Sequence, residues 1–215
     1  MQDAIIIQRS DSSRHGPTEL VLLLHGVGAS AESLRPLGEA LAGSLNHAWI
    51  VSVRSPDASE LGGWQWFSVQ GITEANRAAR VAAAMPRFVE TVRHWQLEAG
   101  VDGAATTLIG FSQGAIMALE STQLHQPPAG RFVAIAGRFA QTPRVAPAHA
   151  RLHLMHGEQD RVMPVALAVA AAERLRELGT NVTLDRFAGL GHGIDGRLAR
   201  RLIERMGTDR EGTPG

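Results

Sequence analysis

The stretch 110–114, G-F-S-Q-G, constrains the fold of this chain more than any other part of the sequence. An apolar run over residues 105–110 precedes it, and a helix-like run over residues 115–124 follows it. A G-x-S-x-G pattern between a strand and a helix is typical of a nucleophile elbow, a sharp turn that holds its serine in a strained backbone conformation. We therefore predict that Ser112 lies at the end of a strand, beside the N-terminus of a helix.

Apolar runs that suit strands alternate with helical periodicities along the whole chain, which predicts an α/β fold. Such alternation favours a mostly parallel sheet, here of about seven strands, with helices on both faces. The predicted strands cover residues 4–8, 19–24, 49–53, 105–110, 131–136, 151–155 and 181–187. The predicted helices cover residues 34–45, 74–98, 115–124, 165–178 and 197–206, with a kink expected near Ala82 because of Pro86. Residues 54–73 have no obvious regular structure and suit a lid or binding loop.

The chain of 215 residues, 44% of them hydrophobic, is long enough for one domain with a sizeable core. Nothing in the sequence resembles a linker or a repeat, so we predict a single domain over residues 1–206. The polar, Gly-rich residues 207–215 are expected to form an unstructured tail.

Charge and composition exclude several classes of function. The 21 basic residues are all Arg and are balanced by 21 Asp and Glu, so no basic field attracts nucleic acid. The lack of Lys excludes Schiff-base and P-loop chemistry, and the lack of Cys excludes disulfides and thiolate nucleophiles. No apolar run suits a signal peptide or approaches the ~20 residues of a membrane span. These features predict a cytoplasmic protein without stable membrane insertion.

Three residues that can act in nucleophilic catalysis follow predicted strands, and their order along the chain indicates their roles. Ser112 comes first, Asp160 follows the strand at 151–155, and His192 follows the last strand. Nucleophile, acid, histidine is the chain order of the α/β-hydrolase triad. His192 would take the proton of Ser112 during attack and return it to the leaving group, while Asp160 holds the imidazole in the useful tautomer. The backbone N–H groups of Gln113 and Val27 are the candidate oxyanion donors.

Two alternatives concern these assignments. Glu158 lies two residues before Asp160 and is the rival for the acid of the triad. His25 and His156 each precede a glycine at a strand end, which favours structural hydrogen bonding over catalysis. No spaced set of His and carboxylate residues indicates a metal site.

The chain resembles the phospholipase/carboxylesterase family of α/β hydrolases, which includes the acyl-protein thioesterases. The resemblance rests on residues 24–28, 110–114, 156–164 and 191–192, and residues 65–73 resemble a loop of a bacterial esterase subgroup. It implies a hydrolase without a large cap domain, acting on carboxylic esters or thioesters without a cofactor. It also supports the triad and the oxyanion pair, and it allows a homodimer. Ser68 departs from the family, much of which has Asp after the same Trp-Phe pair, so the preference of the protein thioesterases is not carried over.

The predicted function is that of a serine carboxylesterase or thioesterase that forms an acyl-enzyme on Ser112 with a small-molecule substrate. Apolar residues near the strand ends are candidates for an acyl pocket: Trp64, Trp66, Phe67, Met163, Leu190 and Ile194. The alternatives are a non-catalytic ligand-binding protein on the same fold, and a peptidase or acyltransferase with the same triad.

Overall fold

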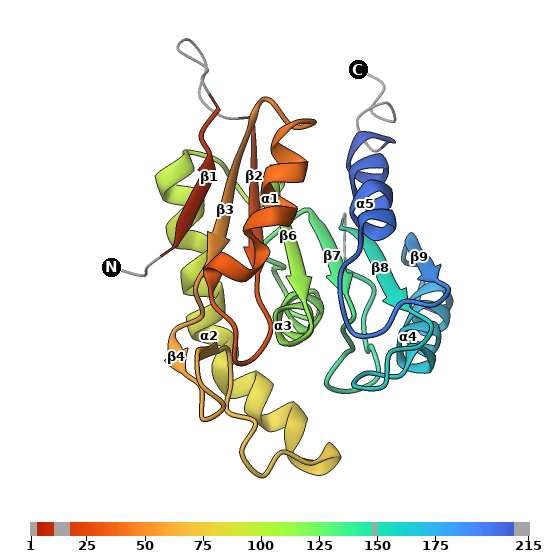
Figure 1. The fold of residues 1–215 in the computed structure, drawn as a ribbon. Coiled ribbons are helices and arrows are strands. Elements are labelled where there is room, and N and C mark those ends of the chain that lie inside the picture. The colour runs from red at the N-terminus through yellow and green to blue at the C-terminus, as the bar shows by residue number, and fades with distance from the viewer. Residues whose placement is uncertain (1–3, 11–17, 148–149, 209–215) are drawn as a thin grey trace.

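The computed structural model describes residues 4–10, 18–147 and 150–208, and a seven-stranded sheet forms its centre (Figure 1). Every neighbouring pair of strands is parallel except β1 and β3, which are antiparallel. The predicted mostly parallel sheet is therefore confirmed. In spatial order the strands are β1 (Ile5–Gln8), β3 (Ala48–Val53), β2 (Glu19–Leu24), β6 (Thr106–Phe111), β7 (Arg131–Ile135), β8 (Arg151–Gly157) and β9 (Val182–Phe187).

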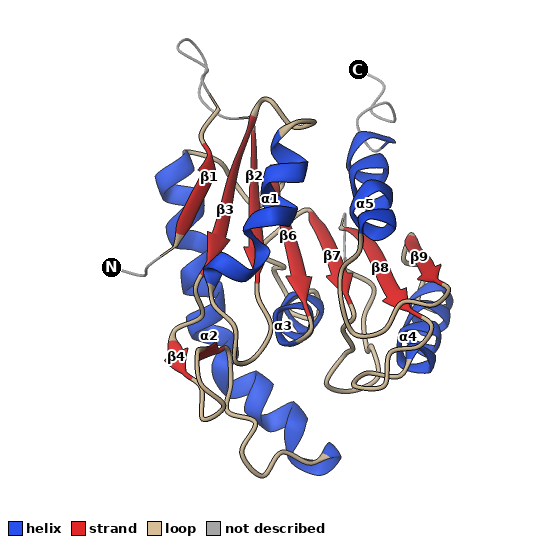
Figure 2. Cartoon of the chain, viewed as in Figure 1, coloured by secondary structure: helices blue, strands red, loops and turns tan. Residues whose placement is uncertain are grey.

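Helices cover both faces of the sheet, and no large cap lies over it (Figure 2). On one face lie the 3-10 helix η1 (Ala31–Leu34), α1 (Arg35–Ala42) and α5 (Gly196–Thr208). On the other face lie α2 (Glu74–Ala99), α3 (Gln113–Ser121) and α4 (Val165–Glu177). This is the arrangement that alternating strands and helices predict.

Strand β2 shows why its sequence is continuously apolar. Leu20, Leu22 and Leu24 belong to the core under α2, α3 and α4, whereas Val21 and Leu23 belong to the core under α1 and α5. All five side chains are fully buried. Because successive side chains of a strand point to opposite faces, a strand covered on both faces needs apolar residues at every position.

The carboxyl ends of the parallel strands lie at one edge of the sheet, where Figure 1 shows the arrowheads of β6, β7 and β8. The loops after β6, β8 and β9 carry Ser112, Asp160 and His192 respectively. Topology therefore brings together three segments that are far apart in the sequence.

The connection over residues 54–73 contains a small hairpin that the sequence did not indicate. It consists of β4 (Asp57–Ala58) and β5 (Trp64–Gln65), paired antiparallel. A bridge from Ala29 to Trp64 joins this hairpin to the loop after β2. Strands of two residues leave no periodic signal in a sequence, which explains why the prediction missed them.

Helix α2 is one continuous helix over residues 74–99 and includes Pro86. The kink that the sequence predicted near Ala82 stays a prediction. A capping box starts it: the Thr73 hydroxyl accepts the N–H of Asn76 at 3.3 Å, and the Asn76 side chain accepts the N–H of Thr73 at 2.8 Å. Gly100 ends it in the left-handed conformation, with φ of 70°. Both ends are therefore determined by local sequence.

Helix α5 extends to Thr208, so the first two residues of the predicted tail 207–215 are helical. Residues 209–215 lie outside the described residues. Asp195 caps the start of α5, since its carboxylate accepts the N–H of Arg197 at 3.0 Å and that of Leu198 at 2.9 Å. None of the helices in the described ranges is both long and apolar enough to cross a membrane.

Candidate active site

Ser112 stands at the sharp turn between β6 and α3. Its backbone has φ of 52° and ψ of −112°, a conformation that costs a non-glycine residue about 1–3 kcal/mol. Its N–H donates to the carbonyl of Ile135 at 2.9 Å, and its carbonyl accepts the N–H of Ile116 at 3.1 Å. The strain at Ser112 is thus held by bonds to β7 and to α3, as a nucleophile elbow requires.

Two glycines of the motif permit this turn for a steric reason. A Cβ at Gly110 would collide with the backbone of Gly114, and a Cβ at Gly114 would collide with the carbonyl groups of Leu24 and His25. The colliding atoms belong to backbone, which cannot rotate away. The G-x-S-x-G spacing therefore reflects the close approach of α3 to the end of β2.

His192 lies between Ser112 and Asp160. Its Nε2 is 3.0 Å from the hydroxyl oxygen of Ser112, and its Nδ1 is 2.7 Å from Oδ2 of Asp160. With the proton on Nδ1 donated to the carboxylate, Nε2 is free to accept the hydroxyl proton of Ser112. The three side chains have the geometry in which His192 acts as a general base.

Asp160 is held on the side opposite His192 by backbone donors. Its Oδ1 accepts the N–H groups of Val162 at 2.9 Å and Met163 at 2.8 Å. Burial alone raises the pKa of Asp160, but the hydrogen bonds from His192 and these two N–H groups outweigh it and lower the pKa. Nε2 of His156 is 3.3 Å from Oδ2 and also donates to the carbonyl of Met163 at 2.7 Å. Asp160 is therefore ionised and held in position near neutral pH.

Glu158, the rival for the acid, faces a different partner. Its carboxylate lies 3.6 Å from the guanidinium of Arg186 on β9, and its side chain is 40% exposed. The distances favour Asp160 as the group that orients His192.

The two candidate oxyanion donors flank the nucleophile. Gln113 is the first residue of α3, where N–H groups have no intrahelical acceptor. Val27 lies in the turn after β2, which is held by a bond of 2.9 Å from the N–H of Gly28 to the carbonyl of Trp64. Both residues line the same cavity as Ser112.

A cavity of about 500 Å³ opens at Ser112, within the range of about 300–1,000 Å³ that small-molecule sites occupy. Of the six predicted pocket residues, Phe67 and Met163 line it. Its other apolar walls come from residues that were not among the predicted pocket residues: Val69, Ile116, Val162, Pro164, Ala166 and Leu167.

The other four predicted pocket residues are not among the residues that line this cavity. Trp66 is only 2% exposed, packs edge-to-face against Phe88 in the core and donates its Nε1 proton to the carbonyl of His25. Trp64 lies in β5, beneath the guanidinium of Arg54. Leu190 and Ile194, which lie two residues before and two residues after His192, pack against the core under α1 and α5. Proximity to a strand end did not determine which face each side chain would take.

A model of the phospholipase/carboxylesterase family matches residues 6–207. The chain belongs to this family. It is 47% identical over 205 residues to esterase YpfH of Escherichia coli K12, an alignment that covers 95% of this chain and 87% of that relative.

Solved structures place this family member among the α/β hydrolases. Esterase PE8 superposes with a TM-score of 0.82 at 26% identity, covering 98% of this chain and 97% of the other. The carboxylesterase of Bacillus cereus superposes with a TM-score of 0.79, covering 95% and 93% of the two chains, and its 20% identity shows the fold alone. The α/β-hydrolase fold predicted from the sequence is confirmed.

The side chain of Gln113 has a role in this family member that its place in the motif did not indicate. Its oxygen accepts the N–H of Trp66 at 2.7 Å, and its nitrogen donates to the carbonyl of Phe67 at 2.7 Å. The residue next to the nucleophile therefore fixes the loop that forms one wall of the cavity. No signal in the sequence pairs these positions, which lie 47 and 46 residues apart.

His25 connects the oxyanion turn to the same loop. Its Nε2 accepts the N–H of Ser55 at 3.0 Å, so its Nδ1 carries the proton and donates to the carbonyl of Gly26 at 2.7 Å. Burial lowers the pKa of His25, against the opposing effect of the bond to Gly26. The imidazole is thus neutral and holds backbone rather than a reacting atom.

Charged residues also line the cavity, although the sequence analysis did not single them out. Arg77, Glu74 and Arg138 contribute to its wall together with the apolar residues. Within the described parts of the chain, no group of three or more His, Asp and Glu side chains is placed to hold a metal ion.

Proposed function

We propose that this chain hydrolyses carboxylic esters through an acyl-enzyme on Ser112, with His192 as general base and Asp160 as the group that orients it. That the chain is an esterase follows from its family and from its likeness to the YpfH esterase. The observation that carries the mechanism is the pair of contacts of His192, at 3.0 Å to Ser112 and 2.7 Å to Asp160.

In the first half of the reaction the hydroxyl oxygen of Ser112 attacks the ester carbonyl carbon while Nε2 of His192 takes its proton. The tetrahedral intermediate then collapses, the bond to the alcohol oxygen breaks, and His192 gives the proton to the departing alcohol. In the second half a water molecule attacks the acyl-enzyme with the same proton transfers. The carboxylic acid leaves, and Ser112 regains its proton.

The negative charge on the carbonyl oxygen needs donors that are already in place. The N–H groups of Gln113 and Val27 are proposed as these donors, because both residues line the cavity at Ser112. Removing one such donor typically lowers kcat about 10²–10³-fold. Both are backbone groups, so side-chain substitution at either position leaves them present.

The first test is hydrolysis of p-nitrophenyl esters from acetate to palmitate by the wild type and by Ser112→Ala. Loss of the nucleophile is expected to lower kcat by about 10⁶-fold in a triad whose members act as a unit. Ser33→Ala is the matched control, since Ser33 is exposed on η1 and bonds only to the carbonyl of Ser30 among the described residues. Turnover by Ser112→Ala near the wild-type rate would exclude the mechanism.

A fluorophosphonate probe tests the nucleophile independently of the choice of ester. It should add its mass to the wild type at Ser112 and leave Ser112→Ala unmodified. The assembled triad argues against the alternative of a non-catalytic ligand-binding protein. A wild type that the probe does not label would favour that alternative.

The finer predictions rest on the sequence alone. Thioester hydrolysis, tested with an acyl thioester beside its oxygen ester, stays a prediction of the family resemblance. The homodimer is likewise a prediction of the family resemblance. The cytoplasmic location and the absence of nucleic-acid binding stay predictions from composition and charge.

A further inference from the structure

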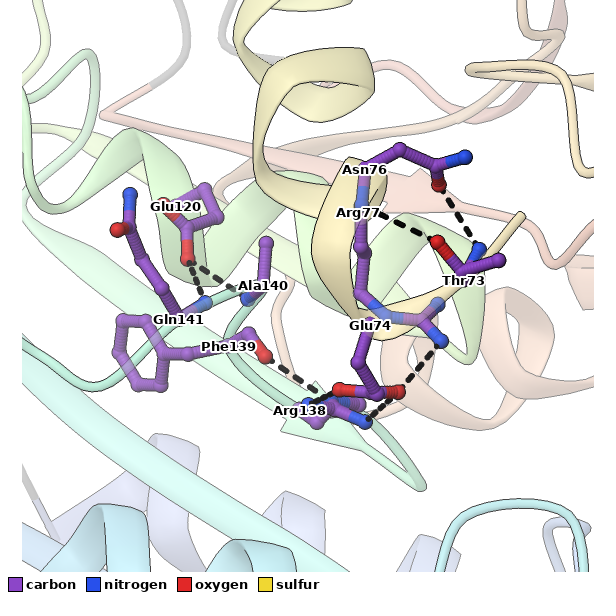
Figure 3. Close-up of polar contacts among 9 residues, drawn as sticks. All are labelled: Thr73, Glu74, Asn76, Arg77, Glu120, Arg138, Phe139, Ala140 and Gln141. Atoms are coloured by element: carbon purple, nitrogen blue, oxygen red, sulfur yellow. Dashed lines mark hydrogen bonds and ion pairs between the residues drawn. The ribbon is translucent and has the colours of Figure 1, made fainter.

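Two arginines and one glutamate form a charged cluster in the wall of the active-site cavity (Figure 3). Arg138, which follows β7, binds Glu74 with two parallel bonds of 3.0 and 2.8 Å. Arg77, one turn along α2, donates to the same carboxylate at 2.9 Å. Hydrogen bonds from Arg138 and Arg77 lower the pKa of Glu74, so the carboxylate is ionised near neutral pH. The cluster therefore carries a net charge of one positive unit.

The three side chains differ in how far they reach solvent. Glu74 is 68% exposed, whereas Arg77 and Arg138 are each 17% exposed. The carboxylate thus lies on the solvent side of the cluster, and the cations lie further in. Because Glu74, Arg138 and Leu167 also line a neighbouring hollow of about 360 Å³, the cluster stands where the two spaces meet.

Buried bonds fix Arg138 in this position. Its Nε donates to the carbonyl of Phe139 at 3.0 Å, and the buried carboxylate of Glu120 accepts the N–H of Ala140 at 2.7 Å (Figure 3). Glu120 belongs to α3, the helix that starts beside Ser112. Helix α3 therefore holds the loop that carries Arg138, while the guanidinium itself is oriented by the carbonyl of Phe139 and by Glu74. Such support from neighbouring residues is how a preorganised binding group is built.

The arginines keep donors that Glu74 does not use. Among the described residues, the bonds above occupy three of the five N–H donors of Arg138 and one of those of Arg77. An arginine with unfilled donors beside an apolar cavity is suited to a carboxylate, which accepts such bonds with its planar pair of oxygens.

We infer that Arg77 and Arg138 make the cavity selective for esters that carry a carboxylate away from the scissile bond. This inference rests on the proposed ester hydrolysis at Ser112 and names the substrate class of that site. The apolar walls hold the hydrocarbon part of the substrate, and the two guanidinium groups bind its anionic end. Glu74 offsets one of the two positive charges and so limits the strength of that binding.

The test compares two esters that differ only in the terminal group, mono-p-nitrophenyl adipate and the neutral p-nitrophenyl 6-methylheptanoate. Arg77→Gln and Arg138→Gln are each expected to lower the ratio of kcat/KM for the adipate ester to that for the neutral ester about tenfold, the order that one charged hydrogen bond contributes. Arg93→Gln is the matched control, because Arg93 is an exposed arginine of α2 that lines a separate hollow. It should leave the ratio unchanged.

Glu74→Gln is expected to change the ratio of the two kcat/KM values in the opposite direction. It removes the carboxylate that offsets the arginines and should raise the same ratio several-fold, by the order of a surface charge interaction. If the cluster only tied α2 to the loop after β7, all three substitutions would weaken both esters alike. An unchanged ratio in the arginine variants, both for this pair of esters and for the second pair described below, would overturn the inference.

A second arm of the test, with another pair of esters, shows on which side of the scissile bond the substrate carries its carboxylate. In 4-(hexanoyloxy)benzoate the carboxylate is on the alcohol side, and 4-isopropylphenyl hexanoate is its neutral counterpart. A dependence on the arginines in either arm supports the inference and assigns the side, and a dependence in neither arm contradicts it.

Binding without turnover separates this inference from the proposed function. Monomethyl adipate, titrated into Ser112→Ala, should bind about tenfold more tightly than into Ser112→Ala with Arg138→Gln, again the order of one charged hydrogen bond. If the esters are not hydrolysed but this difference is found, the proposed function fails and the anion site stands. If hydrolysis depends on Ser112, and neither this difference nor a dependence on the arginines in either pair of esters is found, the inference fails alone.

Discussion

Replacing Asp160 by Asn probes the triad with the least change of shape. Oδ1 of Asp160 accepts two backbone N–H groups, those of Val162 at 2.9 Å and Met163 at 2.8 Å. These donors require an oxygen, so the amide oxygen of Asn takes that position and the NH₂ group faces Nδ1 of His192. Because NH₂ can only donate, the imidazole must carry its proton on Nε2, which then cannot accept the proton of Ser112.

The magnitude of this loss has an upper and a lower bound. In the Ser-His-Asp template the wrong tautomer lowers kcat by about 10⁴-fold, or about 5.4 kcal/mol at 1.36 kcal/mol per tenfold. If the amide of the introduced Asn flips instead, its oxygen accepts the Nδ1 proton of His192 and restores the productive tautomer. The NH₂ group then faces the N–H groups of Val162 and Met163 and leaves both unpaired, at about 1–3 kcal/mol each. The flipped form is thus about 2 kcal/mol or more unfavourable, so kcat should fall at least about thirtyfold.

The assay measures kcat on p-nitrophenyl butyrate at saturating substrate near neutral pH, with thermal melting to show that each variant is folded. Glu158→Gln is the control, since Glu158 is partly exposed and faces Arg186. Its kcat should stay within about twofold of the wild type, as for an ordinary surface substitution. A loss below tenfold for Asp160→Asn, or an equal loss for Glu158→Gln, would refute the assignment.

Two further substitutions test the surroundings of the site. Gln113→Ala leaves the N–H of Trp66 and the carbonyl of Phe67 unpaired and should lower the free energy of unfolding by about 1–3 kcal/mol for each group. It keeps the backbone N–H, so a kcat loss as large as that of Ser112→Ala would contradict this reading. Burial raises the pKa of Glu120, so the stability this group contributes is full below its unfolded pKa of about 4.3 and is lost as pH rises through its folded pKa. Glu120→Gln keeps an acceptor for Ala140 and should raise the Tm relative to the wild type at neutral pH but not near pH 4; a gain of equal size at both pH values would refute this.

Local patterns predicted the fold because the physical constraints are themselves local. The run of β2 predicted a strand covered on both faces, and both cores bury it. The capping residues of α5 and the glycine spacing around Ser112 are likewise readable within a few positions. The order of Ser112, Asp160 and His192 predicted their meeting, since parallel strands end at one edge of a sheet.

The walls of the cavity could not be predicted in this way. Trp66 and Phe67 are neighbours in the sequence and both are buried in the same core, yet only Phe67 also lines the cavity. Which side each ring takes depends on the bonds from Gln113 and on packing against Phe88, which sequence spacing does not contain.

The sequence by itself therefore determined the class of sheet, the elbow and the candidate reacting groups, because each depends on backbone sterics or hydrophobic periodicity over short distances. Only the tertiary structure decided what surrounds those groups. Glu74 and Arg138 lie 64 residues apart and meet through the packing of α2 against the loop after β7. The proposed selectivity of this site thus depends on long-range contacts between side chains, while its proposed chemistry depends on a motif.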